Sequence, residues 1–164
     1  MAARQACAGV PAQETPATAT AWTQRASTAS SVSVSVERVP SGLFVLEPCR
    51  MLDTREPSGP VGGPALLAQS ARQFPATGSC GIPSTARALV ANVTVVNGQT
   101  SGVLRATSGD MAMSVASVVP FSAGIVRGNN LVLRLSVNSG GTLAIRNDSD
   151  GPVNVILDVS GYFE

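Results

Sequence analysis

The segment that decides the fold class lies near the end of the chain and reads Val153-Asn154-Val155-Ile156-Leu157-Asp158-Val159. Its odd-numbered positions are all apolar, which places branched side chains together on one face of an extended strand. Residues 88–96 and 130–137 show the same period of two, and no window of the chain shows a convincing helical period. The sequence therefore predicts an all-β fold.

Turn sequences rich in glycine, proline, asparagine and aspartate divide residues 40–164 into short pieces of roughly regular spacing. The predicted strands are Leu43–Leu46, Ala71–Pro75, Ala88–Val96, Gly102–Thr107, Ser114–Val119, Asn130–Val137, Thr142–Arg146 and Val153–Val159. We expect one domain over residues 40–164, built as an antiparallel two-sheet sandwich or a jelly-roll-like barrel. Within it, residues 147–151 are predicted to form a hairpin turn between the last two strands, and a weak calcium loop is the alternative.

Residues 1–39 are expected to form an extension outside this domain. The segment lacks the apolar stretch of a signal peptide, so an export signal is expected upstream or export by another route. Residues 31–36 alternate serine with Val32, Val34 and Val36, which predicts a strand within 31–39. This strand is either the first strand of the domain's own sheet or an extended N-terminal arm that adds to a neighbour's sheet edge. Trp22, the aromatic residue expected outside the core, is assigned to the same arm.

The composition argues against most catalytic chemistry. The chain has 164 residues and no histidine, and its 11 basic residues are all arginine. The serine–histidine–aspartate triad, imidazole metal sites and lysine Schiff bases are therefore excluded. A formal net charge of +1 with dispersed arginines does not suit nucleic-acid binding, and no apolar run is long enough to span a membrane. We expect a non-enzymatic protein without cofactor or metal.

The three cysteines indicate whether the protein resides in an oxidising or a reducing compartment. Cys49 and Cys80 lie inside the expected domain and Cys7 lies outside it. This arrangement fits one disulfide plus an odd thiol, and two reduced buried thiols are the alternative. A bridge between Cys49 and Cys80 would close a loop of about 30 residues, which is worth roughly 3–4 kcal/mol in the chain-entropy description.

Five motifs occur in a fixed order between about residues 44 and 163. They are Cys49-Arg50-Met51-Leu52-Asp53-Thr54-Arg55, the glycine-rich Gly59–Pro64, Cys80-Gly81-Ile82-Pro83, Asn92-Val93-Thr94 and Asp158-Val159-Ser160-Gly161-Tyr162-Phe163. Together they resemble a β-rich domain of secreted bacterial proteins. The resemblance implies export, a disulfide between the two motif cysteines and a sandwich-like module that generally has no assigned activity.

The charged residues of the first and last motifs are predicted to serve architecture. Asp53 and Arg55 share a face of an extended backbone, and Asp158 lies on a strand with a buried pattern, where a carboxylate needs a partner. We expect Arg50, Asp53, Arg55 and Asp158 to form an ion-pair network. Binding of a sugar or carboxylate ligand by Asp53 and Arg55 is the alternative.

These observations lead to a functional expectation. We expect an exported structural or assembly subunit, a building block of a surface or extracellular filament, that associates with itself through strand pairing of the N-terminal arm. The alternative is a cell-surface adhesion or carbohydrate-binding module, in which Asp53, Arg55, Asp148 and Asp150 would line the site. The expected partners are thus further copies of the same chain, or surface glycans. The expected location is extracellular or at the cell surface.

Overall fold

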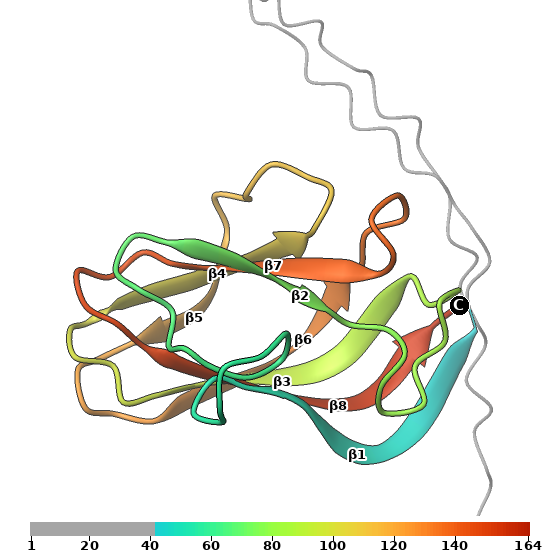
Figure 1. The fold of residues 1–164 in the computed structure, drawn as a ribbon, viewed down its shortest axis with the longest axis horizontal. Helices are drawn as coiled ribbons and strands as arrows, with labels where there is room; N and C mark the ends of the chain where they lie inside the picture. The colour runs from blue at the N-terminus through green and yellow to red at the C-terminus, as the bar shows by residue number, and fades with distance from the viewer. Residues whose placement is uncertain (1–41) are drawn as a thin grey trace, which may run out of the picture. The chain divides into compact units, whose positions relative to one another are not determined.

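A computed structural model describes residues 42–164, and within them it contains strands and no helix (Figure 1). The alternation of apolar and polar residues found in the sequence produces most of these strands. Their bounds are β1 (Leu43–Asp53), β2 (Ala71–Pro75), β3 (Ala88–Val96), β4 (Gly102–Ser108), β5 (Ser117–Phe121), β6 (Arg127–Arg134), β7 (Thr142–Asn147) and β8 (Asn154–Phe163). The predicted all-β class is confirmed.

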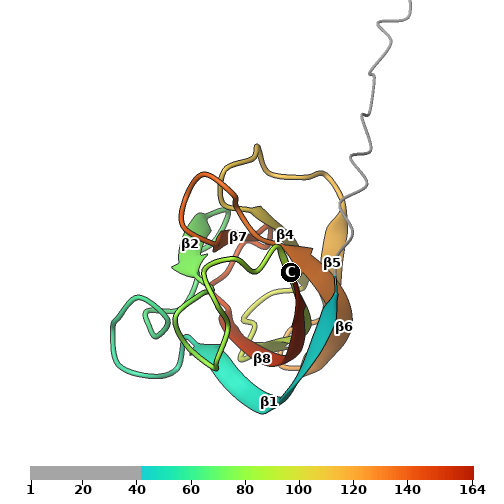
Figure 2. The same cartoon turned by 90° about the vertical axis from the view of Figure 1, so that its right-hand side faces the viewer.

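The strands form two antiparallel four-stranded sheets, with the orders β1-β8-β3-β6 and β2-β7-β4-β5. Figure 2 shows the two layers from the end, with β8 and β1 on one side and β2, β7 and β4 on the other. Among the eight described strands, only β4 and β5 are neighbours both in the chain and in a sheet, and every other connection crosses between the sheets. This order is that of a jelly roll, as the sequence predicts.

The core lies between the inner faces of the two sheets. Val153, Val155, Leu157 and Val159 are fully buried, so the face predicted from the 153–159 segment is confirmed. Alternate residues of β3, namely Ala91, Val93 and Val95, are buried beside them, and Phe74 and Ile145 are among the residues contributed by the opposite sheet. Two β-patterned faces therefore enclose one apolar layer.

Several predicted boundaries were wrong. β1 does not end at Leu46 but continues to Asp53, across two irregularities in its pairing with β8. These irregularities remove the simple alternation from which strands are predicted. β5 begins at Ser117 rather than Ser114, and β6 ends at Arg134, so Val137 is exposed instead of sharing the buried face of Leu133.

The predicted hairpin turn between β7 and β8 was also wrong. These two strands belong to different sheets, and residues 148–153 carry the chain from one sheet to the other. The buried side chain of Asn147 organises this connection: its Nδ2 donates to the carbonyl oxygens of Leu67 at 3.0 Å and Gly151 at 2.8 Å, and its Oδ1 accepts from Ser149. A buried amide with its hydrogen bonds satisfied thus replaces the expected tight turn.

The predictions for the N-terminal arm, including Trp22, Val32, Val34 and Val36, lie outside the described residues. Among residues 42–164 no helix is long and apolar enough to cross a membrane.

Candidate functional site

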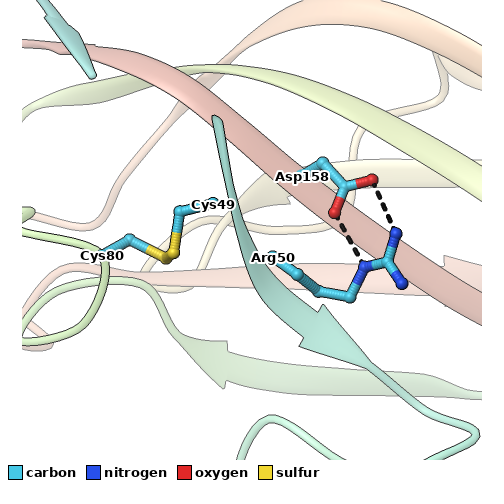
Figure 3. Close-up of a disulfide and its surroundings, with 4 residues drawn as sticks. All are labelled: Cys49, Arg50, Cys80 and Asp158. Carbon is cyan, nitrogen blue, oxygen red and sulfur yellow. Dashed lines mark hydrogen bonds and ion pairs between the residues drawn. A yellow bond between two sulfur atoms is a disulfide. The ribbon is translucent and has the colours of Figure 1, made fainter. Parts of the chain in front are cut away.

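The predicted site residues gather around the second half of β1. Figure 3 shows that Cys49 and Arg50, which are adjacent in the chain, project to opposite sides of this strand. Cys49 is bonded to Cys80, with 5.8 Å between the two Cα atoms, so the predicted disulfide is present. The bond ties β1 to the loop between β2 and β3.

On the other side of β1, Arg50 reaches across to β8. Its Nε donates to Asp158 Oδ1 at 2.8 Å and its Nη2 to Asp158 Oδ2 at 3.2 Å (Figure 3). The two residues are direct partners in the β1–β8 register, which explains the two-pronged geometry. Both side chains are partly exposed, so this ion pair is a surface pair rather than a buried one.

Asp53, at the end of β1, is the buried member of the cluster, with 4% of its side chain exposed. Arg55 Nε donates to its Oδ1 at 2.8 Å and Arg55 Nη2 to its Oδ2 at 2.5 Å, and the backbone N–H of Arg55 also donates to Oδ1. Arg50 Nη1 lies 3.5 Å from the same carboxylate. The structure thus places Arg50, Asp53, Arg55 and Asp158 in one continuous network of two arginines and two aspartates.

The residue between Asp53 and Arg55 extends the contact with β8. Thr54 is buried, and its N–H donates to the carbonyl oxygen of Val155 at 3.0 Å. Its Oγ1 accepts a hydrogen bond from the Val155 N–H at 2.8 Å and donates to Asn154 Oδ1 at 3.0 Å. The Asp-Thr-Arg motif therefore fastens the end of β1 to the start of β8.

The hydrogen bonds set the protonation of this cluster. The two side-chain bonds from Arg55 lower the pKa of Asp53 below its ordinary value of 3.8, against the opposing effect of its burial. The bond to Asp158 raises the pKa of Arg50, and the bond to Asp53 raises that of Arg55. All these shifts keep the groups charged, which is the opposite of what a proton-transferring residue requires.

A hollow of about 320 Å³ lies beside the network, lined by residues 50–53, 56–57 and 59–62. Four of the lining residues, 59–62, belong to the glycine-rich motif Gly59–Pro64. A Cβ atom on Gly63 would lie 2.7 Å from the carbonyl oxygen of Glu56, so the close approach of the two loop segments requires glycine there. The Asp53 carboxylate at the margin of this hollow is already bonded to arginines, so it is not a free group for a ligand.

A polar row on the outer face of the β1-β8-β3-β6 sheet was not predicted from the sequence. Arg50, Asp158, Asn92 and Asn130 are successive register partners across its four strands. Asn92 Nδ2 donates to Asn130 Oδ1 at 2.9 Å. The Asn92-Val93-Thr94 motif contained the signal, because its alternation places Asn92 opposite the buried Val93, but the cross-strand partners come from the topology.

The other acidic residues considered for a ligand site lie in the β7–β8 connection. The Asp148 carboxylate is paired with Arg105 and Arg146, which lower its pKa together, Arg105 having the larger effect. Asp150 is exposed and accepts a hydrogen bond from Gln69 Nε2 at 3.3 Å. Within the part of the chain that the structure describes, no three acidic or cysteine side chains are grouped as metal ligands.

Fold and site together define the class of this molecule, a disulfide-bonded jelly-roll sandwich with an ion-paired first strand. No family model matches the chain, and no curated protein matches its sequence at a significant level. The resemblance to a domain of secreted bacterial proteins therefore remains a prediction from the motifs.

Proposed function

We propose that this protein is an exported, non-enzymatic structural subunit that assembles with copies of itself. The observation that carries the proposal is the exposed apolar surface on the outer face of the β1-β8-β3-β6 sheet. Val45 pairs with Gly161, Gly161 with Val90, and Val90 with Val132, so these four residues form one row across the four strands. The side chains at the two ends are exposed, Val45 to 81% and Val132 to 59%. Exposed apolar side chains at both ends of such a row are suited to contact with another protein.

Two further features support the proposal. Charged residues make up 13% of the chain, so contact between copies would remove few charges from water. The disulfide and the ion-pair network stabilise the domain without creating a reactive group, which suits a building block outside the reducing interior of the cell.

The experiment is a measurement of particle size on the full chain by sedimentation and electron microscopy. We expect rings or filaments, and replacing Val32, Val34 and Val36 together by serine should shift them to monomers. The matched control replaces Ser33 and Ser35 by alanine, which keeps the valine face. A wild-type chain that stays monomeric at high concentration would contradict the proposal, and so would normal assembly of the triple variant.

Adhesion to surface glycans is a second candidate, favoured by the polar row of Arg50, Asp158, Asn92 and Asn130. The amide groups of Asn92 and Asn130 on this outer face are suited to sugar hydroxyls, whereas the carboxylates of Asp53, Asp148 and Asp158 are engaged by arginines. A glycan array with the wild-type chain, with Asn130→Ala as the control, tests it. Binding that disappears in Asn130→Ala would favour adhesion, and no binding to any glycan would refute it.

A further inference from the structure

Each sheet of the sandwich has two edge strands, and three of the four edges are protected. β5 and β6 contact one another across the open side of the sandwich (Figure 2), and Asn129 Nδ2 of β6 donates to the Val118 carbonyl oxygen of β5 at 2.8 Å. β2 has only five residues and ends at Pro75. Its Arg72 donates to the carbonyl oxygens of Gly59 and Pro64 in the neighbouring loop. Short strands, proline and side-chain cover are the usual protections against strand addition.

The first half of β1, residues 43–47, lacks the shortness and the side-chain cover of these edges within the described residues, and the proline of this strand, Pro48, lies just after it. It forms the outer margin of its sheet (Figure 1), and among the described strands it pairs only with β8. Gly42 and Glu164 exchange both backbone hydrogen bonds, at 2.9 and 3.2 Å, and Phe44 faces Tyr162 two residues later. By the alternation of an antiparallel ladder, the N–H and C=O groups of Leu43 and Val45 therefore point away from β8, toward the open edge.

The side chains of residues 43–46 along this edge are apolar as well, and the exposed Glu47 is the one charged residue of the segment. Leu43, Phe44 and Val45 are all exposed, and lysine, the commonest protecting residue of strand edges, is absent from the chain. The second half of β1 differs, because Asp53 N–H donates to the Val61 carbonyl oxygen and the disulfide fixes Cys49. The free edge is thus confined to residues 43–47.

We propose that the edge of β1 at residues 43–47 accepts, by strand addition, the serine–valine segment 31–36 of a second copy of this chain. The inference rests on the proposed function and names the surface at which assembly occurs. Segment 31–36 has the period of two that an added strand needs, and its valine face would continue the outer apolar row that begins with Leu43 and Val45.

The backbone of Gly42, just before β1, is hydrogen-bonded to the last residue of the chain. Its N–H donates to the Glu164 carbonyl oxygen, so it is not available to close a tight turn that would bring residue 39 back alongside Leu43. A longer loop over residues 37–42 needs no bond from Gly42, so segment 31–36 of the same chain is the competing occupant, and the cross-linking test below separates it from a second copy. A second copy at this edge would link copies head to tail.

Cross-linking between differently tagged full-length copies tests the contact, in a Cys7→Ser background. One copy carries Val34→Cys and the other carries Val45→Cys or Leu43→Cys, and Val132→Cys on the same outer face is the control. We expect a covalent heterodimer with position 43 or 45 and none with position 132. The inference is wrong if neither edge position links, if position 132 links equally well, or if bonds form only when both cysteines are in one copy.

A second variant separates the contact from assembly in general. Val45→Pro removes one outward N–H without removing a donor to β8, whereas Val45→Thr keeps it. We expect Val45→Pro to raise the concentration of half-assembly by about tenfold or more, with Val45→Thr close to wild type. If the wild-type chain assembles and Val45→Pro assembles equally well, this inference fails and the proposed function stands. If the wild-type chain does not assemble at all, the proposed function itself fails.

Discussion

The two halves of β1 are held in different ways. Residues 49–53 are bonded on every side: a disulfide on one face, the Arg50–Asp158 pair on the other, and a buried Asp53 at the end. In residues 43–47, Leu43, Phe44 and Val45 pair with β8 and with no other described strand, and their apolar side chains are exposed. A single strand thus combines a segment that stabilises the domain with a segment left open, and stability and interaction can be altered separately.

Among changes to the bonded half of β1, removal of the disulfide should lower the stability of the domain most. The bond spans 31 residues, so the double variant Cys49→Ala, Cys80→Ala should lose about 3–4 kcal/mol of unfolding free energy and about 10 °C in melting temperature. Urea and thermal unfolding measure the loss. Cys7→Ala serves as the control, and an equal loss in that variant would show that the 49–80 bond is not the source.

Loss of the buried carboxylate should come next. Asp53→Asn removes the charge that binds Arg55 and Arg50, and we expect a destabilisation of about 1–3 kcal/mol. Asp158→Asn is the matched control, because its ion pair with Arg50 is exposed and should matter less. Urea titrations of both variants make the comparison. A greater loss in Asp158→Asn than in Asp53→Asn would contradict the importance of burial at this end of β1.

Acid should reduce the stability that Asp53 provides at the end of β1, gradually as the pH falls. Because the pKa of Asp53 is lowered in the folded state, its contribution is complete above its ordinary pKa and is lost as the pH falls below about 4. The chain has no histidine, the residue that usually titrates between pH 5 and 8, so stability should be flat there. Urea unfolding of wild type and Asp53→Asn measures the difference in their unfolding free energy, which should shrink below pH 4. A difference that grows there would contradict the lowered pKa of Asp53 in the folded state.

The smallest effect on stability is expected in the open half. Val45→Ser changes an exposed side chain that packs against nothing in the core, so the unfolding free energy should stay within about 0.5 kcal/mol of wild type. Thermal unfolding of dilute protein provides the measurement. A loss comparable to that of Asp53→Asn would mean that residues 43–47 stabilise the domain after all.

The alternating segments made most of the fold predictable. β2 and β3 have the predicted bounds, and the buried faces of β3 and β8 follow from their valines. The second half of β1 escaped prediction because Pro48 and the two pairing irregularities interrupt the alternation. The β7–β8 connection was misread because Asp150-Gly151 favours a turn locally, whereas the buried Asn147 satisfies a crossing between sheets that only the topology requires.

The candidate site was predictable to the extent that its residues lie in motifs. The proximity of Arg50 and Asp158, which are 108 residues apart, depends on the pairing of the first strand with the last. The polar row through Asn92 and Asn130 and the open edge of β1 depend on strand order and on the direction of backbone groups. Neither the strand order nor the direction of the backbone groups can be predicted from a single sequence.

The pairing of β1 with β8 also constrains how the domain folds. Among the described strands, only β4 and β5 form a hairpin of strands that follow one another in the chain, so their ladder closes the shortest loop. The sheet that contains β1 lacks its second strand until Phe163 has been synthesised. We therefore expect the sheet of β1 to close after translation of residues 42–164, and slowly, because the strands that it joins are far apart in the chain.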